Sequence, residues 1–543
     1  MVWIQNYNPL SSLFFSVLFA LLPLIALLYF LAIRHMKGLY ACAISLGTAI
    51  ALALFVWQMP AGLAFSAIFN GMLFGLFPIG WVILNAMWLY NMNVESGQFN
   101  QIRNFLSFLT PDRRLQAVLI AFVLGAFLEG TAGFGTPVAI SAALLIGLGF
   151  PPITAAAIAL ISNSAPVAFG GLGLPATVAS QITGLDPFAV GKASGLAISL
   201  LCFLTPFVIT TMLAGYRKMM EIFPILFGVG FFYAGLQYSI ASFINPYLPM
   251  FLSSGITLIL LATVFHYWQP KSIWRFPEDP PLVEQEKPDN KKLLQALLPF
   301  ILLAIMVFLW SDLQYTGFKS WILALEKFFY NPVIHWPGLH EKIMRMPPAV
   351  GEPTPYGAIY FFNFISSTGT AIFLASLLSV AFMGKYSYKK AYYCFGRTLY
   401  QLRFALGTLP IVLALAYIMN YSGMSTTLGL AFNSLGAFFP FFAPLIGYIG
   451  VFLTGSEVSC NALFGLLQRT NAEALGFDPN AMIAANMTGG GSAKMITAQT
   501  ISVATAATGQ SGQEGKILER TWKVSLLYLG LSCLFSGTIA YLI

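Results

Sequence analysis

Residues 452–464 read FLTGSEVSCNALF and lie between long apolar runs. Within eight positions they place five polar side chains: Thr454, Ser456, Glu457, Ser459 and Asn461. A second stretch, FLEGTAGFGTPVA at 127–139, sets Glu129 among glycines in an equally apolar setting. Two such stretches indicate that the chain contains a repeated element and that both copies serve one functional site.

The composition around these stretches is that of a membrane protein. Of the 543 residues, 58% are hydrophobic and only 8% are charged, against roughly 25% charged residues in soluble domains. The apolar runs at 11–33 and 38–58 each exceed the roughly 20 residues that cross a bilayer as a helix. They lack the period-2 alternation of membrane barrels, so the expected spans are helices.

Basic residues set the expected orientation, because short loops rich in Lys and Arg stay on the cytoplasmic side. They collect near 34–37, 103–114, 216–218, 271–292 and 385–403. One topology places all five inside, with spans near 11–33, 38–58, 61–91, 188–213, 223–242, 249–267, 294–312, 357–382, 404–421 and 524–543. Both termini and the segment 313–356 then lie outside the cytoplasm. The net charge of +8 is therefore interpreted as a topology signal and not as a nucleic-acid surface.

The region 115–184 is apolar but repeatedly interrupted by Gly and Pro. Unwound backbone is tolerated at membrane depth only where protein buries it or where it lines a wet cavity. The pattern predicts a re-entrant hairpin near 115–150, with its tip near 129–136, followed by a broken helix near 153–184.

The second half of the chain repeats this plan. MN and SG at 92–97 correspond to MN and SG at 419–423, FLEG corresponds to FLTG, and NSAPVAFGG at 163–171 corresponds to NMTGGGSAK at 486–494, at offsets of 323 to 327 residues. The matches predict a second hairpin near 440–471 and a second broken helix near 480–509. In the topology above, the two copies have opposite orientations, which is typical of secondary transporters.

The expected fold is therefore an all-α polytopic membrane protein. It has about 12 transmembrane helices, two re-entrant hairpins and two broken helices in an inverted repeat. The first repeat covers 1–214, extra spans and a charged cytoplasmic linker cover 215–293, and the second repeat covers 294–543.

Broken helices expose unpaired amides that bind anions without a full cation. Side chains at the hairpin tips would complete a polar cage for a substrate, and glycines would let backbone approach it. The candidate substrate-binding residues are Thr131, Gly133, Gly135, Thr136, Asn163, Ser164, Gly170, Gly171, Thr454, Gly455, Ser456, Ser459, Asn461, Asn486, Thr488, Gly489, Gly490, Ser492 and Lys494.

Three charged residues at membrane depth need a function, because insertion of each costs about 2.5 to 3.5 kcal/mol. A carboxyl that gains and loses a proton as the site reorients is a coupling device. Glu129 is the first candidate for this role and Glu457 the second; the alternative is a buried structural pair, such as Glu457 with Lys494. Lys494 is expected to counter a substrate carboxylate, with snorkelling to an interface as the alternative.

No cofactor or metal is expected. The five cysteines are scattered without CxxC spacing, the four histidines lie in or beside loops, and HExxH is absent. GGGSAK lacks the G-x4-GK[ST] spacing of a nucleotide loop, which disfavours transport driven by ATP.

The hairpin and broken-helix segments closely resemble those of the bacterial L-lactate permease family. The resemblance rests on FLEGTAGFGTPVAISAALLIGLGF, NSAPVAFGGLG, MPP at 346–348, FLTGSEVSCNALF and NMTGGGSAKMI, in this order. It implies a symporter of the cytoplasmic membrane that carries lactate with a proton, often accepting both enantiomers and glycolate. Glu457 stands where Asp is usual in that family, and Ala498 stands where Pro is usual.

These observations predict proton-coupled symport of a short 2-hydroxymonocarboxylate, with the lipid bilayer as the surroundings and no prediction of oligomeric state. A sodium-coupled carboxylate carrier is the nearest alternative, because unwound carbonyls and hydroxyl side chains also suit Na⁺. A membrane-embedded enzyme is disfavoured because no nucleophile and base are paired in the sequence. The duplicated acidic sites also argue against a passive channel.

Overall fold

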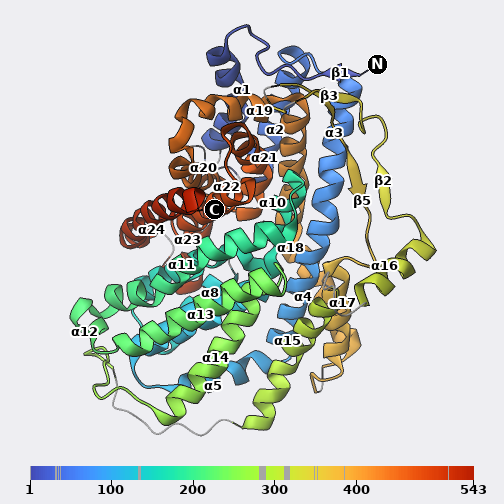
Figure 1. Ribbon diagram of the computed structural model, residues 1–543. Coiled ribbons are helices and arrows are strands. Elements are labelled where there is room, and N and C mark those ends of the chain that lie inside the picture. Colours follow the sequence, from blue (N-terminus) through green and yellow to red (C-terminus); the bar gives the residue numbers. More distant parts are fainter. Residues whose placement is uncertain are drawn as a thin grey trace.

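The computed structural model describes residues 2–542 except 31–33, 35, 37, 132–135, 280–288, 311–317, 348, 351, 385 and 511–512. Helices dominate the described chain and run side by side in one bundle (Figure 1). The predicted polytopic helical fold with broken helices is confirmed.

The first half of the chain begins with long spans and then shortens into interrupted helices. Its helices are α1 (Leu13–Leu28), α2 (Gly38–Phe55), α3 (Ala61–Phe74), η2 (Gly75–Gly80), α4 (Trp81–Glu95), α5 (Gln98–Leu109), α6 (Arg113–Ala117), η3 (Val118–Leu124), α7 (Gly125–Thr131), α8 (Thr136–Gly147), α9 (Pro152–Ser164), η4 (Val167–Phe169), α10 (Gly170–Thr183) and α11 (Pro187–Ala214). Several join end to end: 61–95 and 113–131 each form one long apolar run.

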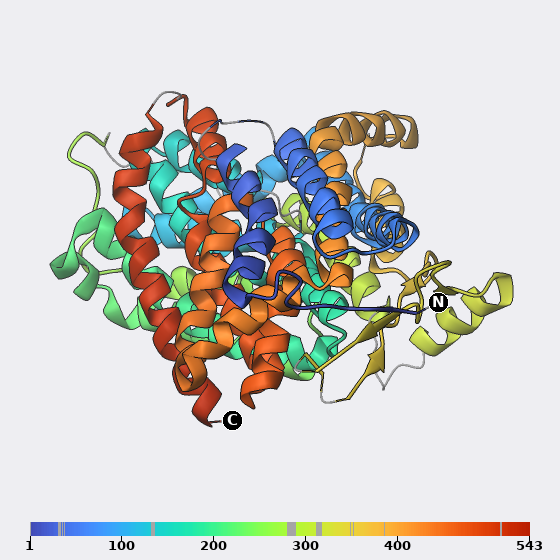
Figure 2. The same cartoon turned by 90° about the horizontal axis from the view of Figure 1, so that it is seen from above.

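The rest of the chain, from Tyr216 on, also contains long spans and interrupted helices. Its helices are α12 (Tyr216–Met220), α13 (Phe223–Phe243), α14 (Pro249–Tyr267), α15 (Asn290–Trp310), α16 (Phe318–Phe329), α17 (Thr368–Val380), α18 (Tyr388–Ser422), α19 (Met424–Phe432), η5 (Asn433–Phe438), α20 (Phe439–Thr454), α21 (Glu457–Leu475), α22 (Pro479–Lys494), α23 (Ala498–Thr508) and α24 (Glu514–Leu542). Helix α24 runs along the edge of the bundle opposite to α16 and the strands (Figure 2).

Within the described residues, nine helices are long and apolar enough to cross a membrane, or ten if the bent pair 152–164 and 167–183 counts as one span. Four shorter apolar helices lie at 13–27, 137–147, 249–265 and 368–380. The total of about 12 transmembrane helices stays a prediction.

Five short strands add a small β-structured part to the predicted helices. They are β1 (Trp3–Ile4), β2 (Val333–His335), β3 (Ile343–Arg345), β4 (Thr354–Pro355) and β5 (Ile359–Phe361). β3 pairs with both β1 and β4, and β2 pairs with β5 in antiparallel register. The expected span 357–382 therefore begins later than predicted, because β5 occupies its start and Ser367 caps α17 by accepting from the Gly369 amide at 3.2 Å.

Helix α18 begins at Tyr388, well before the predicted start at 404. Lys and Arg between 385 and 403 suggested a loop, but long basic side chains are good helix formers, so the span continues as a helix beyond its apolar part.

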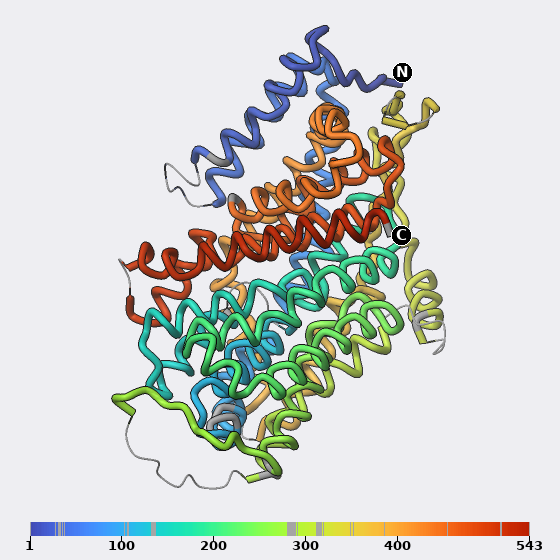
Figure 3. Tube along the Cα trace, turned by 60° about the vertical axis from the view of Figure 1, so that its left-hand side comes forward, coloured from blue at the N-terminus to red at the C-terminus, as the bar shows by residue number. Residues whose placement is uncertain are grey.

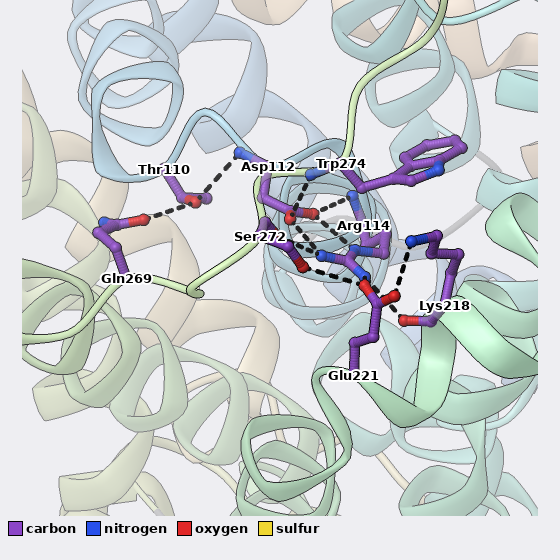
Figure 4. Close-up of polar contacts among 8 residues, drawn as sticks. All are labelled: Thr110, Asp112, Arg114, Lys218, Glu221, Gln269, Ser272 and Trp274. Atoms are coloured by element: carbon purple, nitrogen blue, oxygen red, sulfur yellow. Dashed lines mark hydrogen bonds and ion pairs between the residues drawn. The ribbon is translucent and has the colours of Figure 1, made fainter.

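The two termini lie at the same end of the bundle as the strands (Figure 3). Helix α12 and the chain that follows α14 lie at the opposite end. There, the fully buried Arg114 side chain pairs with Asp112 at 2.7 Å and with Glu221 at 2.9 Å, and donates to the backbone carbonyls of Lys218 and Ser272 (Figure 4). This cluster fixes the base of the first hairpin to the segments that precede α13 and follow α14.

Candidate functional site

In two helical hairpins, the helix ends that carry Glu129 and Glu457 are buried in the bundle. In the first, α7 ends at Thr131 and α8 begins at Thr136, so Glu129 lies in the last turn before the tip. In the second, α20 ends at Thr454 and is capped by Gly455, whose φ of 68° is the left-handed conformation that favours glycine. Ser456 then caps α21 by accepting from the Ser459 amide at 3.3 Å, which makes Glu457 the first residue of that helix.

The first broken helix follows the first hairpin. Segments 152–164 and 167–183 are bent by 64°. At the start of α10, the three residues Gly171, Leu172 and Gly173 adopt positive φ values of 52°, 57° and 67°, so the regular helix is interrupted there. A side chain at Gly173 would collide with the Pro246 carbonyl, so both the conformation and the close approach require glycine.

The second broken helix follows the second hairpin. Helix α22 ends at Lys494, and α23 begins at Ala498 with Thr497 as its cap. The Thr500 hydroxyl donates to the Lys494 carbonyl at 2.6 Å, which satisfies one of the carbonyls that the break leaves without a helical partner.

The two broken helices approach each other closely at Gly491, which has no side chain. A Cβ built on Gly491 of α22 would lie 2.9 Å from the Ser164 carbonyl at the end of α9. This backbone approach brings the two breaks to one place in the protein, although they lie more than 300 residues apart in the sequence.

A cavity lies among Glu129 of the first hairpin, the start of α21 in the second hairpin and the two breaks. Its lining residues are Glu129, Val167, Gly170, Gly171, Leu174, Pro175, Gly455, Ser456, Glu457, Val458, Lys494 and Gln499. Both hairpins and both broken helices contribute, so segments more than 300 residues apart in the sequence form one cavity.

Glu129 is held by a donor in the cavity. Its side chain is 3% exposed, and one carboxylate oxygen accepts from the Asn163 amide at 3.0 Å. Gly170 makes room for the carboxyl, because a Cβ there would lie 2.9 Å from the other oxygen. Asn163 and Gly170 therefore position the carboxyl of Glu129. Gly170 also lines the cavity, whereas Asn163 does not.

Glu457 is equally buried but has no such donor. Its side chain is 3% exposed, and neither carboxylate oxygen has a hydrogen-bond partner among the residues that the structure describes. A Cβ on Gly490 of α22 would collide with both oxygens, so the absence of a side chain there leaves space for the carboxyl.

Lys494 lies at the end of α22 and lines the cavity together with the two acids. Its ammonium donates to the Gly455 carbonyl at 2.7 Å, and it interacts electrostatically with both Glu129 and Glu457. In the described part of the chain, neither acid comes within 4.0 Å of it. The ammonium has three N–H donors, so two are left for other partners, and this arrangement can hold a small carboxylate.

Several predicted substrate residues lie outside the cavity lining. Thr131, Ser164, Thr454, Thr488 and Ser492 donate their hydroxyls to carbonyls of their own helices. Ser459 and Gly489 are also absent from the lining, and a side chain at Gly489 would collide with the Pro444 carbonyl. Gly133 and Gly135 lie outside the described residues, as does the side chain of Thr136.

Asn461 and Asn486 bond to each other instead of facing the cavity. The Asn461 amide donates to the Pro175 carbonyl at 3.0 Å and its oxygen accepts from Asn486 at 2.9 Å. Gln468 extends this hydrogen-bond network, because its side-chain amide donates to the Asn486 side-chain oxygen at 3.2 Å and to the Ala443 carbonyl at 2.9 Å. This network ties the unwound start of α10 to α21, α22 and α20.

Sequence reasoning did not identify five lining residues: Val167, Leu174, Pro175, Val458 and Gln499. Gln499 carries the clearest missed signal, because it is a polar residue directly after the second break. A side chain at Gly455 would collide with it, so Gln499 packs on the tip of the second hairpin. The other four are apolar residues of half-helices, which resemble ordinary packing positions.

Comparisons with known proteins agree on one family. The family model described as L-lactate permease matches residues 16–543. The glycolate permease GlcA of Escherichia coli K12 is 40% identical over 99% of this chain and 98% of its own length. The L-lactate permease of Salmonella typhimurium is 40% identical over 100% of this chain and 99% of its own length. Among solved structures, the YdaH transporter of Alcanivorax borkumensis aligns with 93% of this chain and 98% of its own, at 14% identity and a TM-score of 0.47.

Proposed function

Because this chain belongs to the L-lactate permease family, we propose that it carries L-lactate together with a proton across the bacterial cytoplasmic membrane. We further propose that it carries D-lactate and glycolate. For glycolate, the proposal rests on a relative that is a glycolate permease. The family and the apolar helices make the chain a multi-pass permease of the inner membrane. The coupling to protons and the identity of the substrate are what we propose beyond membership of the family.

The cavity at the hairpin tips carries this proposal. It contains one lysine and two glutamates, and it is small, internal and lined by residues from both copies of the repeated pattern. Lys494 would bind the substrate carboxylate, and the positive N-terminal end of α21 at Ser456 and Glu457 would add to the attraction. Ser456 and Gln499 are the lining residues whose side chains can bond a 2-hydroxyl group.

Proton coupling follows from the charge of the substrate. Moving an anion alone into the cell costs about 2.3 kcal/mol per 100 mV of inside-negative potential, whereas an anion with a proton is electroneutral. Glu129 and Glu457 are the carboxyl groups in the cavity that can take up this proton. The proton gradient then drives accumulation of the acid.

We also propose that the two halves are inverted copies, 1–214 and 294–543, around the extra segment 215–293. The order of elements supports this assignment. In each half a left-handed glycine ends a long helix, Gly97 after α4 and Gly423 after α18, and a hairpin and a broken helix follow. With the basic loops in the cytoplasm, both termini would be extracytoplasmic.

Uptake into proteoliposomes tests the function. We expect labelled L-lactate to accumulate when the outside is more acidic than the inside, and to stop accumulating when an ionophore collapses the pH difference. Replacement of sodium by choline should leave uptake unchanged. Accumulation that needs sodium and ignores the pH difference would instead establish the sodium-coupled alternative.

A further inference from the structure

We propose that the two cavity acids have different tasks: Glu457 carries the transported proton, and Glu129 remains ionised as the fixed counter-ion of Lys494. This proposal rests on the proposed proton-coupled function. The sequence made both glutamates candidates for the proton carrier. This proposal assigns that role to Glu457 alone.

The first observation is the hydrogen bonding of the two carboxyl groups. Glu129 accepts from the Asn163 amide, and a donor of this kind favours the charged form of a carboxyl. Glu457 accepts from no group in the described part of the chain, and both of its oxygens are buried from solvent. A buried carboxylate without a donor is costly, and taking up a proton removes its charge.

The second observation is the space around Glu457. Helix α22 has glycine at position 490, where a Cβ would collide with both carboxyl oxygens, and the Val451 side chain lies on the same spot. The Glu457 carboxyl is therefore held against bare backbone and an apolar side chain. Such surroundings accommodate a neutral carboxyl and exclude the water that an ionised one requires.

The third observation concerns the cations and other titratable groups that face Glu457. Lys494 on α22 is the nearby cation, and it is shared with Glu129 and bonded to the Gly455 carbonyl. Cys460 on α21 and Glu129 on α7 are the other titratable groups of this part of the site. One lysine balances one carboxylate, so with Glu129 ionised the site is neutral when Glu457 is protonated.

These observations imply an order of events. The substrate carboxylate joins Lys494 while Glu457 is protonated, so the loaded site has two negative charges, Glu129 and the substrate, against one positive charge. When the site opens to the cytoplasm, water reaches Glu457, its O–H bond breaks and the proton leaves with the substrate. The empty site returns to the outside with Glu457 ionised, so it carries the same net charge as the loaded site, and Glu457 then takes up another proton from the outside.

Two transport assays on the full chain in proteoliposomes test this division. The variant Glu457→Gln mimics the protonated residue permanently. We expect it to exchange labelled for unlabelled L-lactate at equal pH on both sides, but to lose accumulation driven by a pH difference. Glu457→Asp keeps a carboxyl and should retain that accumulation. Glu129→Gln should lose both exchange and accumulation, because Lys494 loses its fixed counter-ion.

The outcomes separate this inference from the proposed function. If the wild-type protein does not accumulate L-lactate in response to the pH difference, the proposed function itself fails. If the wild-type protein does so and Glu457→Gln does too, only the division of tasks is wrong. Loss of exchange in a Glu457→Gln protein that elutes as a folded species would also overturn the division, since Glu457 would then be needed for substrate binding.

Discussion

Lys494 is the residue on which the proposed binding of an anion depends most. Replacement by alanine would leave two carboxyl groups facing the cavity without their cation. Removal of one partner from a buried charged contact costs about 2–5 kcal/mol, so we expect Lys494→Ala to weaken L-lactate binding by at least about 30-fold. The concentration of half-maximal uptake measures this effect. Lys389→Ala, at the exposed start of α18, is the control and should leave it unchanged.

Gly170 tests whether the Glu129 carboxyl must stay where it is. Its alanine variant puts a methyl group 2.9 Å from a carboxyl oxygen, and such overpacking costs about 1–3 kcal/mol. We expect Gly170→Ala to slow uptake, with folded protein still obtained. Gly147→Ala is the matched control, because no atom lies within 4 Å of a Cβ there. Equal uptake by both variants would show that Glu129 tolerates displacement.

Residue identity alone indicated the charged part of the site better than its hydroxyl part. Charges and glycines at membrane depth have few structural explanations, and Glu129, Glu457, Lys494 and Gly170 all line the cavity. A threonine or serine in a helix can instead donate to the carbonyl four residues earlier, as Thr454 does. The sequence does not distinguish these two arrangements, because both use the same residue types.

Among the elements, the unwound start of α10 is held by the buried network that begins at Asn461. Asn461→Leu would leave the Pro175 carbonyl and the Asn486 amide without their partner, and each unpartnered buried group costs about 1–3 kcal/mol. We therefore expect a clearly lower unfolding temperature in detergent. Asn331→Leu, at an exposed position shortly before β2, should change it little. An unchanged temperature for Asn461→Leu would show that the network does not stabilise the break.

The cluster around Arg114 gives the protein a predictable acid sensitivity. Hydrogen bonds from Lys218 and Arg114 lower the pKa of Glu221 to about 2. Because the folded-state pKa lies below the unfolded value of about 4.3, the stabilisation is fully present above that value and is lost as pH falls toward 2. The difference in unfolding temperature between wild type and Glu221→Gln should therefore be constant from pH 7 to about 5 and should shrink below about 4. A difference that does not depend on pH would contradict this assignment.

Element types were predictable wherever local sequence determines them. Apolar length predicts spans, and Gly and Pro clusters predict breaks; in the described residues the helices are interrupted near 164–173 and 494–498. The pairing of β2 with β5 was not predictable, because it joins segments about 25 residues apart that have no strong alternation. The early start of α18 was missed because basic residues mark both loops and helix ends.

At the scale of the whole molecule, the termini and the strands lie at one end of the bundle and α12 at the other (Figure 3). The basic loops predict that the end with α12 faces the cytoplasm. A single cysteine at Ser434, in the segment that precedes α20, should then react with a membrane-impermeant thiol reagent added to whole cells. A cysteine at Lys218 should react only after the membrane is opened. The reverse pattern would mean that the orientation is wrong.

The meeting of the two hairpins and the two broken helices at one cavity is the central claim, and substrate protection tests it most directly. A cysteine at Ser456 should react with a small thiol reagent in the reconstituted protein, whereas the buried native cysteines should react slowly. We expect L-lactate to slow the reaction at position 456 and to leave a cysteine at Ser434 unaffected. If saturating L-lactate leaves the rate at position 456 unchanged while the same protein still transports it, the substrate binds elsewhere.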